Sequence, residues 1–271
     1  MTAPIAIISA MPDEVSQLLE HLSSERLEQP AAASESRAQH QLRVDRRAGR
    51  DYHSGTLWGT PVVVAFSRWG KVAAASTATH MIAQYAPAEL IFTGVAGALS
   101  PDLRIGDMVV ARDLIHHDLD ATPLFARHEI PLLGVSKIPT TLHIRAGLQR
   151  AADRFLAEDF ARVLPAQQRS DFGLGQPSVV QGEVSSGDSF IADASQAEEI
   201  RANLPQSVCV EMEGAAVAQV CWEHGQEFGV LRTISDTADH AAPLDFPRFV
   251  KEIASSYSYG VLRHYLQDRA L

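Results

Sequence analysis

The chain has 271 residues, enough to bury a sizeable core, and its 46% hydrophobic and 21% charged residues are typical of a globular protein. Its 33 Asp and Glu residues outnumber its 23 Lys and Arg residues, and the resulting formal net charge of −10 excludes nucleic acid and anionic membranes as natural partners. Two cysteines are too few for a disulfide framework and indicate a reducing compartment.

The N-terminal segment lacks the pattern of a targeting signal. No basic region precedes the apolar run at 5–8, and Asp13 and Glu14 follow too early for a signal peptide. No apolar stretch approaches the roughly 20 residues that a membrane span needs. We therefore expect a cytoplasmic protein without membrane association.

Strand and helix signals alternate along the chain. The first half predicts, in order, a strand over 4–8, a helix from about residue 13, a hairpin of strands over 52–57 and 61–66, a helix over 71–85, and strands over 88–92 and 107–111. The second half predicts a helix over 140–164, strands over 177–183 and 207–210, a helix over 211–224, a strand over 228–234 and a helix over 246–266. This alternation is typical of the α/β class, with a mostly parallel, twisted central sheet flanked by helices.

No segment has the composition of an interdomain linker. Residues 1–271 are therefore expected to form a single domain, with polar surface insertions near 24–40 and 160–176. Residues 119–139 contain three prolines and a glycine and are expected to form a long loop, of the kind that often serves as a lid.

Acidic residues follow several of the predicted strands. Glu14, Asp188, Glu213 and Asp236 each stand at or just after a strand's carboxyl end, where functional residues gather in α/β sheets. Two carboxyl groups that flank one bond can act as acid and base, as in glycoside hydrolysis. Taken alone, however, each is more often a first-turn helix acid or a turn cap.

Six segments resemble, in order, the sequence blocks of a known enzyme family. They are 7–15 (IISAMPDEV), 70–75 (GKVAAA), 93–99 (TGVAGAL), 186–191 (SGDSFI), 210–215 (VEMEGA) and 231–236 (LRTISD). With 244–246 (LDF), they are similar to 5′-methylthioadenosine/S-adenosylhomocysteine nucleosidases of the purine nucleoside phosphorylase/uridine phosphorylase superfamily. The resemblance spans nearly the whole chain and implies a nucleoside phosphorylase-like fold.

The resemblance also implies a role for matching residues at the reacting bond. Glu14 matches the general base that activates the attacking water, and Asp236 matches the acid that protonates purine N7. Glu213 matches the ligand of the ribose hydroxyls, with Met212 lining the sugar beside it. Asp188 lies in a matching block, but orienting a loop is the role we expect for it.

Further residues match the walls of the nucleoside pocket. Phe190 matches the aromatic residue that stacks on adenine, and Ile191 the residue whose backbone reads the adenine edge. Gly97 matches a glycine that allows close approach of the nucleoside. Phe246 and Met11 match residues near the 5′ group.

The chain departs from the family at two pocket positions. Trp69 stands where isoleucine is usual near the 5′ group, so an indole there should narrow or reshape that end of the pocket. Packing in the core or in an interface is an equal alternative for Trp69. Val95 stands where many of these nucleosidases carry serine.

The attacking nucleophile is water or phosphate, since the superfamily contains both hydrolases and phosphorylases. Phosphate needs arginines or a backbone nest, and the loop from Gly94 to Gly97 could supply backbone donors. Hexameric purine phosphorylases carry arginines before this loop and after the first strand, where this chain has Phe92 and the acidic pair Asp13 and Glu14. We therefore expect water.

The sequence thus predicts an N-ribosyl hydrolase. Its substrates would be 5′-methylthioadenosine and/or S-adenosylhomocysteine, and its products adenine and a free 5-thioribose sugar. Three alternatives stay open: an aminodeoxyfutalosine nucleosidase, a purine nucleoside phosphorylase, and a catalytically silent nucleoside-binding protein.

No cofactor or metal is expected. His116 and His117 are adjacent, and adjacent side chains on a strand point to opposite faces, which disfavours a shared metal ion. Cys209 and Cys221 lack neighbours that would make a thiolate and are expected to pack in the core. The resemblance implies a homodimer in which the partner's 119–139 region completes the 5′ pocket.

Overall fold

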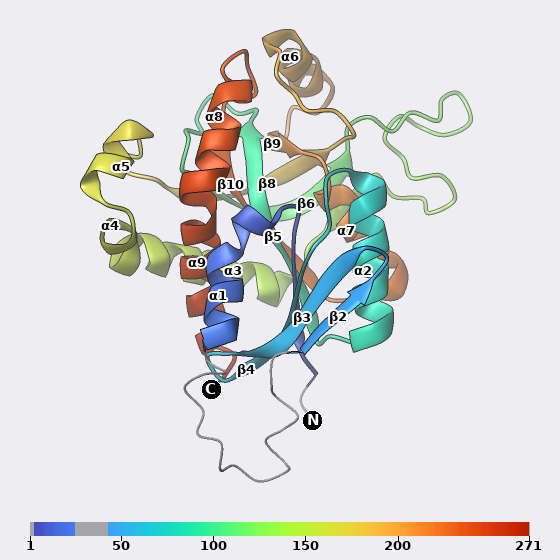
Figure 1. The fold of residues 1–271 in the computed structure, drawn as a ribbon. Helices are drawn as coiled ribbons and strands as arrows, with labels where there is room; N and C mark the ends of the chain where they lie inside the picture. The colour runs from blue at the N-terminus through green and yellow to red at the C-terminus, as the bar shows by residue number, and fades with distance from the viewer. Residues whose placement is uncertain (1–2, 25–42, 271) are drawn as a thin grey trace.

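The computed structural model describes residues 3–24 and 43–270 (Figure 1). The polar insertion expected near 24–40 lies, after its first residue, outside the described residues. The strands are β1 (Ile5–Ser9), β2 (Arg43–Arg47), β3 (Arg50–Leu57), β4 (Thr60–Phe66), β5 (Glu89–Ala98), β6 (Met108–His116), β7 (Lys137–Pro139), β8 (Val179–Ser186), β9 (Ser207–Glu211) and β10 (Phe228–Asp236).

Five of these strands form a closed ring. β5 pairs with β9, β9 with β8, β8 with β6, β6 with β10, and β10 returns to β5. From β5 the sheet continues outward through β1, β4, β3 and β2, and β7 is added beside β6. Parallel and antiparallel pairs both occur, so the sheet is mixed, and the predicted α/β class is confirmed.

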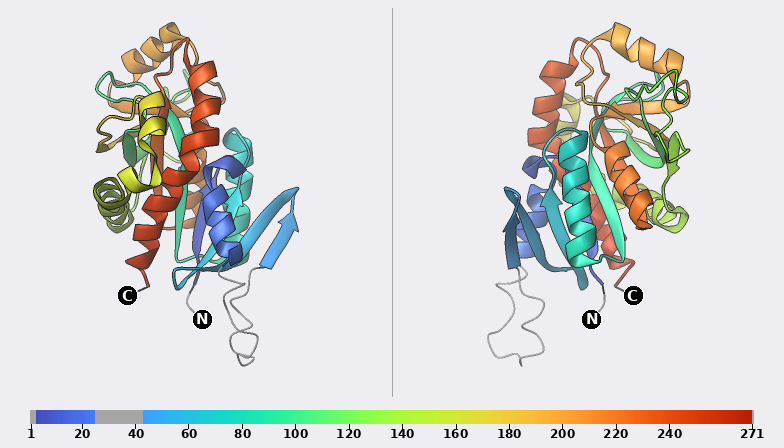
Figure 2. Two further views of the ribbon diagram at one scale, coloured as in Figure 1. Left: turned by 60° about the vertical axis from the view of Figure 1, so that its left-hand side comes forward. Right: turned by 90° about the vertical axis from the view of Figure 1, so that its right-hand side faces the viewer.

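The helices cover the sheet on both faces. They are α1 (Ser16–Ser24), α2 (Lys71–Tyr85), α3 (Leu142–Arg154), α4 (Phe160–Val163), α5 (Ala166–Asp171), α6 (Ala194–Asn203), α7 (Gly214–His224), α8 (Ala242–Phe249) and α9 (Ser255–Gln267), with a 3₁₀ turn η1 (Pro12–Glu14) and π-helical turns η3 (Phe155–Asp159) and η4 (Val250–Ala254). One core cluster joins the sheet to α1, α3 and α9, and a second joins it to α2 and α7. Figure 2 shows the ribbon from two sides, with α1 and α9 toward the viewer in one view and α2 and α7 in the other.

The buried strands explain the apolar runs in the sequence. β1 is buried over its whole length because it pairs in parallel with β4 on one side and β5 on the other, beneath helices on both faces. A strand in that place has no solvent-facing side, so its sequence does not alternate. The same burial pattern continues along β5 and β10 to their carboxyl ends.

The observed boundaries differ from the predicted ones mainly where strands end. β10 continues to Asp236, and Glu211 belongs to β9, so α7 begins at Gly214 rather than at residue 211. Four short elements were not predicted: the exposed, charged strand β2, strand β7 in the segment expected as a long loop, helix α5 and helix α6. Their sequences lack the apolar periodicity on which the predictions rest.

The segment 160–176, expected as a polar surface insertion, contributes to the core. Phe160, Leu164 and Leu174 are buried in the cluster that includes α3 and α9. The Phe160 ring lies edge-on to Phe155 and Tyr257, with centroids 6.3 Å and 6.0 Å away. Polar residues between these positions face solvent, which accounts for the polar composition of the segment.

The close contact between β10 and α3 generates a stability prediction. A Cβ at Gly229 would lie 2.5 Å from Cγ2 of Ile144 and 2.9 Å from Cδ1 of Leu148. Gly229→Ala should therefore lower stability by about 1–3 kcal/mol through overpacking, which thermal melts would report as a fall of several degrees. Gly175→Ala, where a Cβ meets nothing within 4 Å, is the control. Equal melting temperatures for the two variants would contradict the tight packing of β10 on α3.

Candidate active site

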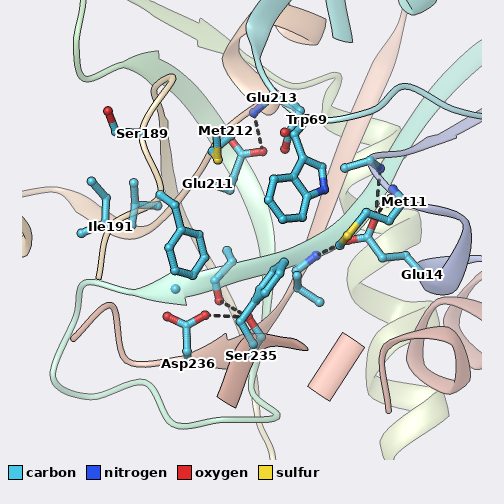
Figure 3. Close-up of a pocket in the computed structure, with 17 residues that line it drawn as sticks. Met11, Glu14, Trp69, Ser189, Ile191, Glu211, Met212, Glu213, Ser235 and Asp236 are labelled. Atoms are coloured by element: carbon cyan, nitrogen blue, oxygen red, sulfur yellow. Dashed lines mark hydrogen bonds between the residues drawn. The ribbon is translucent and has the colours of Figure 1, made fainter. Parts of the chain in front are cut away.

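The ring of strands ends in a pocket (Figure 3). All ten residues proposed from the sequence line it: Met11, Glu14, Trp69, Gly97, Phe190, Ile191, Met212, Glu213, Asp236 and Phe246. They come from the turn after β1, the residues before α2, the end of β5, the loop after β8, the residues before α7, the end of β10, and α8. Figure 3 shows Glu14 on one side of the pocket and Asp236 on the other.

Glu14 is buried and held by four donors. Oε2 accepts from the Ser9 hydroxyl at 2.8 Å and from the backbone N–H groups of Ala10 and Met11 at 2.9 Å each. Oε1 accepts from Val95 N–H at 3.1 Å. Burial raises the pKa of Glu14 more than the hydrogen bonds and the charge of Arg232 lower it. A carboxylate with a raised pKa is suited to accept a proton near neutral pH.

Asp236 lies at the end of β10 and is also buried. Its Oδ1 accepts from Ala238 N–H at 2.9 Å and its Oδ2 from the Ser235 hydroxyl at 2.8 Å. Burial raises its pKa above the usual value, against these two hydrogen bonds. A Cβ at residue 97 would lie 2.8 Å from Asp236 Oδ1, so Gly97 is what allows β5 to approach this carboxyl group. Asp236 can therefore hold a proton that it donates into the pocket.

Glu213 stands immediately before α7. Its Oε1 accepts from Gly70 N–H, at the start of α2, at 2.8 Å. Burial first, and then the charges of Glu211 and Glu14, raise its pKa to about 8, while the Gly70 hydrogen bond and Arg232 act in the opposite direction. Glu213 thus tends to keep its proton when the pocket holds nothing that donates to it.

The sequence argument did not identify the buried ion pair behind the pocket. Arg232 Nη2 donates to Glu211 Oε2 at 2.8 Å, and the two side chains are only 1% and 3% exposed. The guanidinium group also lies 4.0 Å from the ring centroid of Phe92. The sequence signal for this pair was an arginine inside an otherwise apolar strand. A buried arginine of that kind needs a carboxylate or another acceptor as its partner.

Three aromatic side chains line the pocket away from the carboxyl groups. Phe246 of α8 meets Phe190 at a centroid distance of 5.3 Å and Trp69 at 5.8 Å, both edge to face. Trp69 is 52% exposed, so it does not pack in the core of this chain. The indole is free to contact a ligand or a partner subunit.

Asp188 connects the loop after β8 to the start of α2. Its Oδ1 accepts from Lys71 N–H at 2.8 Å, and its own N–H donates to Asp118 Oδ2 at 2.9 Å. Lys71 Nζ in turn lies 2.6 Å from Asp118 Oδ1. Asp188 therefore orients the loop that carries Phe190, while its side chain lies outside the pocket lining.

The histidines and cysteines considered in the sequence analysis make structural contacts. His116 bonds Gln219 at 3.1 Å, whereas His117 packs against Gly187. Cys209 and Cys221 are buried, and burial raises the pKa of both thiols. Within 3–24 and 43–270, no cluster of three or more His, Cys, Asp or Glu side chains is arranged to hold a metal ion, and no helix is long and apolar enough to cross a membrane.

Fold and pocket together define an α/β protein with an acidic pocket at the end of a strand ring. A family model described as the phosphorylase superfamily matches residues 4–267. The chain belongs to this superfamily.

Its relatives carry two different activities in their names. The chain is 34% identical over 246 residues to 5′-methylthioadenosine/S-adenosylhomocysteine nucleosidase of Shewanella halifaxensis, with 91% of each protein covered. It is similar in structure to the nucleosidase of the same name from Neisseria meningitidis in complex with methylthio-immucillin-A (TM-score 0.80, 27% identity, 98% of this chain and 99% of the other). It is also similar to futalosine hydrolase of Helicobacter pylori (TM-score 0.77, 28% identity, 97% of each chain).

The raised pKa of Glu213 predicts a pH-dependent stability. Between pH 4.5 and about 8, the folded protein retains a proton that unfolded Glu213 releases, so this residue destabilises the fold increasingly as pH rises through that window. Glu213→Gln removes the ionisation, and its melting temperature relative to wild type should rise from pH 5 to pH 8.5. Glu223→Gln, at an exposed position of α7, controls for the loss of one negative charge. A relative melting temperature that stays constant with pH would contradict the assignment.

Proposed function

We propose that this protein is a nucleosidase that hydrolyses the N-glycosidic bond of adenine nucleosides with a 5′-thioether group. Its substrates are 5′-methylthioadenosine and/or S-adenosylhomocysteine, and its products are adenine and the free thioribose sugar. The names of its relatives support the substrate class. The observation that carries the choice of reaction is the charge of the pocket lining.

The pocket lining favours water over phosphate as the nucleophile. Four carboxyl groups face it, from Glu14, Glu211, Glu213 and Asp236, and none of its described lining residues is Lys, Arg or His. A phosphate dianion is held by arginine, lysine or convergent N–H groups and is repelled by carboxylates. Water carries no charge and can donate to a carboxylate.

Glu14 and Asp236 divide the proton transfers of the reaction between them. Water attacks C1′ of the ribose as the C1′–N9 bond breaks, and Glu14 accepts the proton that the water loses. Asp236 donates a proton to N7, so adenine leaves as a neutral base. Each such group contributes typically about 10²–10⁴-fold in rate. The raised pKa values of both carboxyl groups suit these roles.

The other pocket residues bind the three parts of the nucleoside. Glu213 accepts from the ribose hydroxyls, with Met212 beside the sugar, and these bonds strengthen as the ring gains positive charge. Phe190 stacks on adenine, whose edge is read by the Ile191 backbone, and Gly97 leaves room for the base. The 5′ group lies among the apolar side chains of Met11, Trp69 and Phe246, which also line the pocket.

We further propose a homodimer whose partner completes the 5′ pocket with its 119–139 region. Large apolar side chains are exposed at the start of α2 and in this loop, where Trp69, Val72, Leu124 and Leu132 face solvent. Exposed apolar patches of this kind mark protein interfaces. The half-exposed Trp69 would then contact the 5′ group and the partner together.

Hydrolysis of an aminodeoxyfutalosine-type nucleoside is the second candidate function. The structural similarity to futalosine hydrolase is close to that of the adenosylhomocysteine nucleosidases. The two reactions share the ribose and the bond that breaks, so the acid, the base and Glu213 serve both. Both substrates carry adenine, so only the contacts at the 5′ group distinguish them.

Product analysis tests the proposal. The protein is incubated with 5′-methylthioadenosine, S-adenosylhomocysteine or aminodeoxyfutalosine, each with and without inorganic phosphate, and the sugar is identified by mass spectrometry. From 5′-methylthioadenosine and S-adenosylhomocysteine we expect a free thioribose sugar both with and without phosphate. A sugar 1-phosphate that forms only with phosphate would identify a phosphorylase, and the absence of turnover on all three would identify a binding protein.

The role of Asp236 predicts a loss of activity that depends on the leaving group. Asp236→Asn should lower kcat on 5′-methylthioadenosine by about 10²-fold or more, because the amide has no proton to give to N7. Hydrolysis of a p-nitrophenyl riboside releases p-nitrophenolate, which leaves without that proton. The kcat on this substrate should therefore fall far less. Steady-state kinetics on both substrates check this, and equal losses would indicate a structural role for Asp236.

The position of Trp69 predicts a change in 5′ selectivity. Trp69→Ile should enlarge the 5′ end and raise the ratio of kcat/KM for S-adenosylhomocysteine over 5′-methylthioadenosine about 10-fold, within the ~1–3 kcal/mol that a few methylene equivalents are worth. Trp222→Ile, an exposed tryptophan of α7 outside the pocket, is the matched control. An unchanged ratio together with a lower melting temperature would instead place Trp69 in a packing role.

A further inference from the structure

Ser9 is buried at the end of β1 and contacts Glu14 directly. Its hydroxyl oxygen lies 2.8 Å from Glu14 Oε2 and 2.7 Å from the Met11 carbonyl oxygen. It also accepts a longer hydrogen bond, of 3.3 Å, from Met11 N–H. The side chain is completely buried and is not part of the pocket lining.

The Ser9 hydroxyl cannot satisfy both acceptors at once. A serine hydroxyl has one hydrogen to donate, and here two oxygens lie at nearly the same distance from it. An ionised carboxylate is the stronger acceptor, so the hydrogen points to Glu14 when Glu14 is charged. Once Glu14 is protonated, that advantage is lost and the Met11 carbonyl remains available.

The other donors to Glu14 have no such choice. The N–H groups of Ala10, Met11 and Val95 belong to the backbone and keep their direction whatever the charge of Glu14. They favour the carboxylate and oppose its protonation. A buried donor without an acceptor is costly. The Ser9 hydroxyl avoids this cost, because it has an acceptor whether Glu14 is ionised or protonated.

We propose that Ser9 is a positioning residue for Glu14, whose hydroxyl donates to the carboxylate before proton transfer and turns to the Met11 carbonyl afterwards. This inference rests on the proposed role of Glu14 as the base. No bond is made or broken at Ser9: the water's proton goes to Glu14, and the hydroxyl only rotates. Ser9 thereby supports the charged form of Glu14 without opposing the protonated form as a fixed donor does.

Two other charged groups act on Glu14 from neighbouring elements. Arg232 of β10 lowers the pKa of Glu14, and Glu213, before α7, interacts with Glu14 as a like charge. A substitution at Ser9 leaves both in place. Any shift that it produces therefore reports the hydroxyl.

The experiment compares Ser9→Ala and Ser9→Thr with wild type in two measurements. The first is a pH titration of the Glu14 side chain by carboxyl-carbon NMR of the free protein, with the signal assigned by its loss in Glu14→Gln. The second is the pH profile of kcat/KM for 5′-methylthioadenosine. Ser185→Ala, which removes a buried hydroxyl bonded to the Cys209 carbonyl outside the pocket, is the control.

We expect Ser9→Ala to raise the Glu14 titration midpoint by about one pH unit, since the carboxylate loses a donor. The acidic limb of the kcat/KM profile should move by the same amount, and kcat at its plateau should fall several-fold. Ser9→Thr should restore both toward wild type, and Ser185→Ala should change neither.

The two measurements separate the possible failures. An unshifted Glu14 titration in Ser9→Ala would overturn the role of Ser9, whether or not the protein is active. A shifted titration with an unmoved acidic limb, or with no turnover in wild type, would support the Ser9 contact and overturn the role of Glu14 as the base. If Ser9→Thr does not fold, the titration of Ser9→Ala still decides.

Discussion

The pocket depends on the buried ion pair between Glu211 and Arg232. It joins the end of β9 to the middle of β10, and Glu211 also accepts from the Ser186 hydroxyl at the end of β8 and from the N–H groups of Glu213 and Gly214. One carboxylate thus connects three strands and the first turn of α7. Removing one partner would leave a buried charge unpaired, which typically costs about 3–5 kcal/mol. The positions of Glu213 and Met212 follow from this pair, because they lie in the turn that it organises.

The same pair determines the charge state of the pocket. Arg232 lowers the pKa of Glu14 and Glu213, but one guanidinium group cannot compensate three buried carboxyl groups. Burial therefore prevails, and the pKa values of Glu14 and Glu213 stay above their usual range. A ligand that donates hydroxyl groups to Glu213 would restore its carboxylate form. In the proposed function, the ribose hydroxyls are the groups that donate to Glu213.

Sequence patterns predicted what depends on local order along the chain. The helix over 71–85 and the buried strand at 4–8 follow from propensity and apolar runs, and the pocket residues follow from the resemblance of six ordered segments to a known family. Contacts between distant segments were not predictable in this way. Ser9 and Glu14 are only five residues apart, yet the strength of their hydrogen bond depends on the burial of Glu14 against β5. The ion pair joins residues 21 apart through the ring of strands, and burial of the 160–176 segment depends on α9.

In the proposed function, the choice of nucleophile follows from how the buried Arg232 is used. Arg232 lies flat against Phe92 and donates to Glu211, while its Nη1 group faces the carbonyl oxygens of Phe92 and Leu231. These contacts keep the guanidinium group of Arg232 behind the pocket wall, and the described pocket lining contains no Lys, Arg or His. An anionic nucleophile would enter among carboxyl groups in a site of low dielectric, where repulsion is weakly screened. In the proposed function, a neutral nucleophile meets no such barrier, and it has a proton acceptor in Glu14. The contact of Arg232 with Phe92 would then favour hydrolysis without touching the substrate, because it keeps the guanidinium group out of the pocket lining.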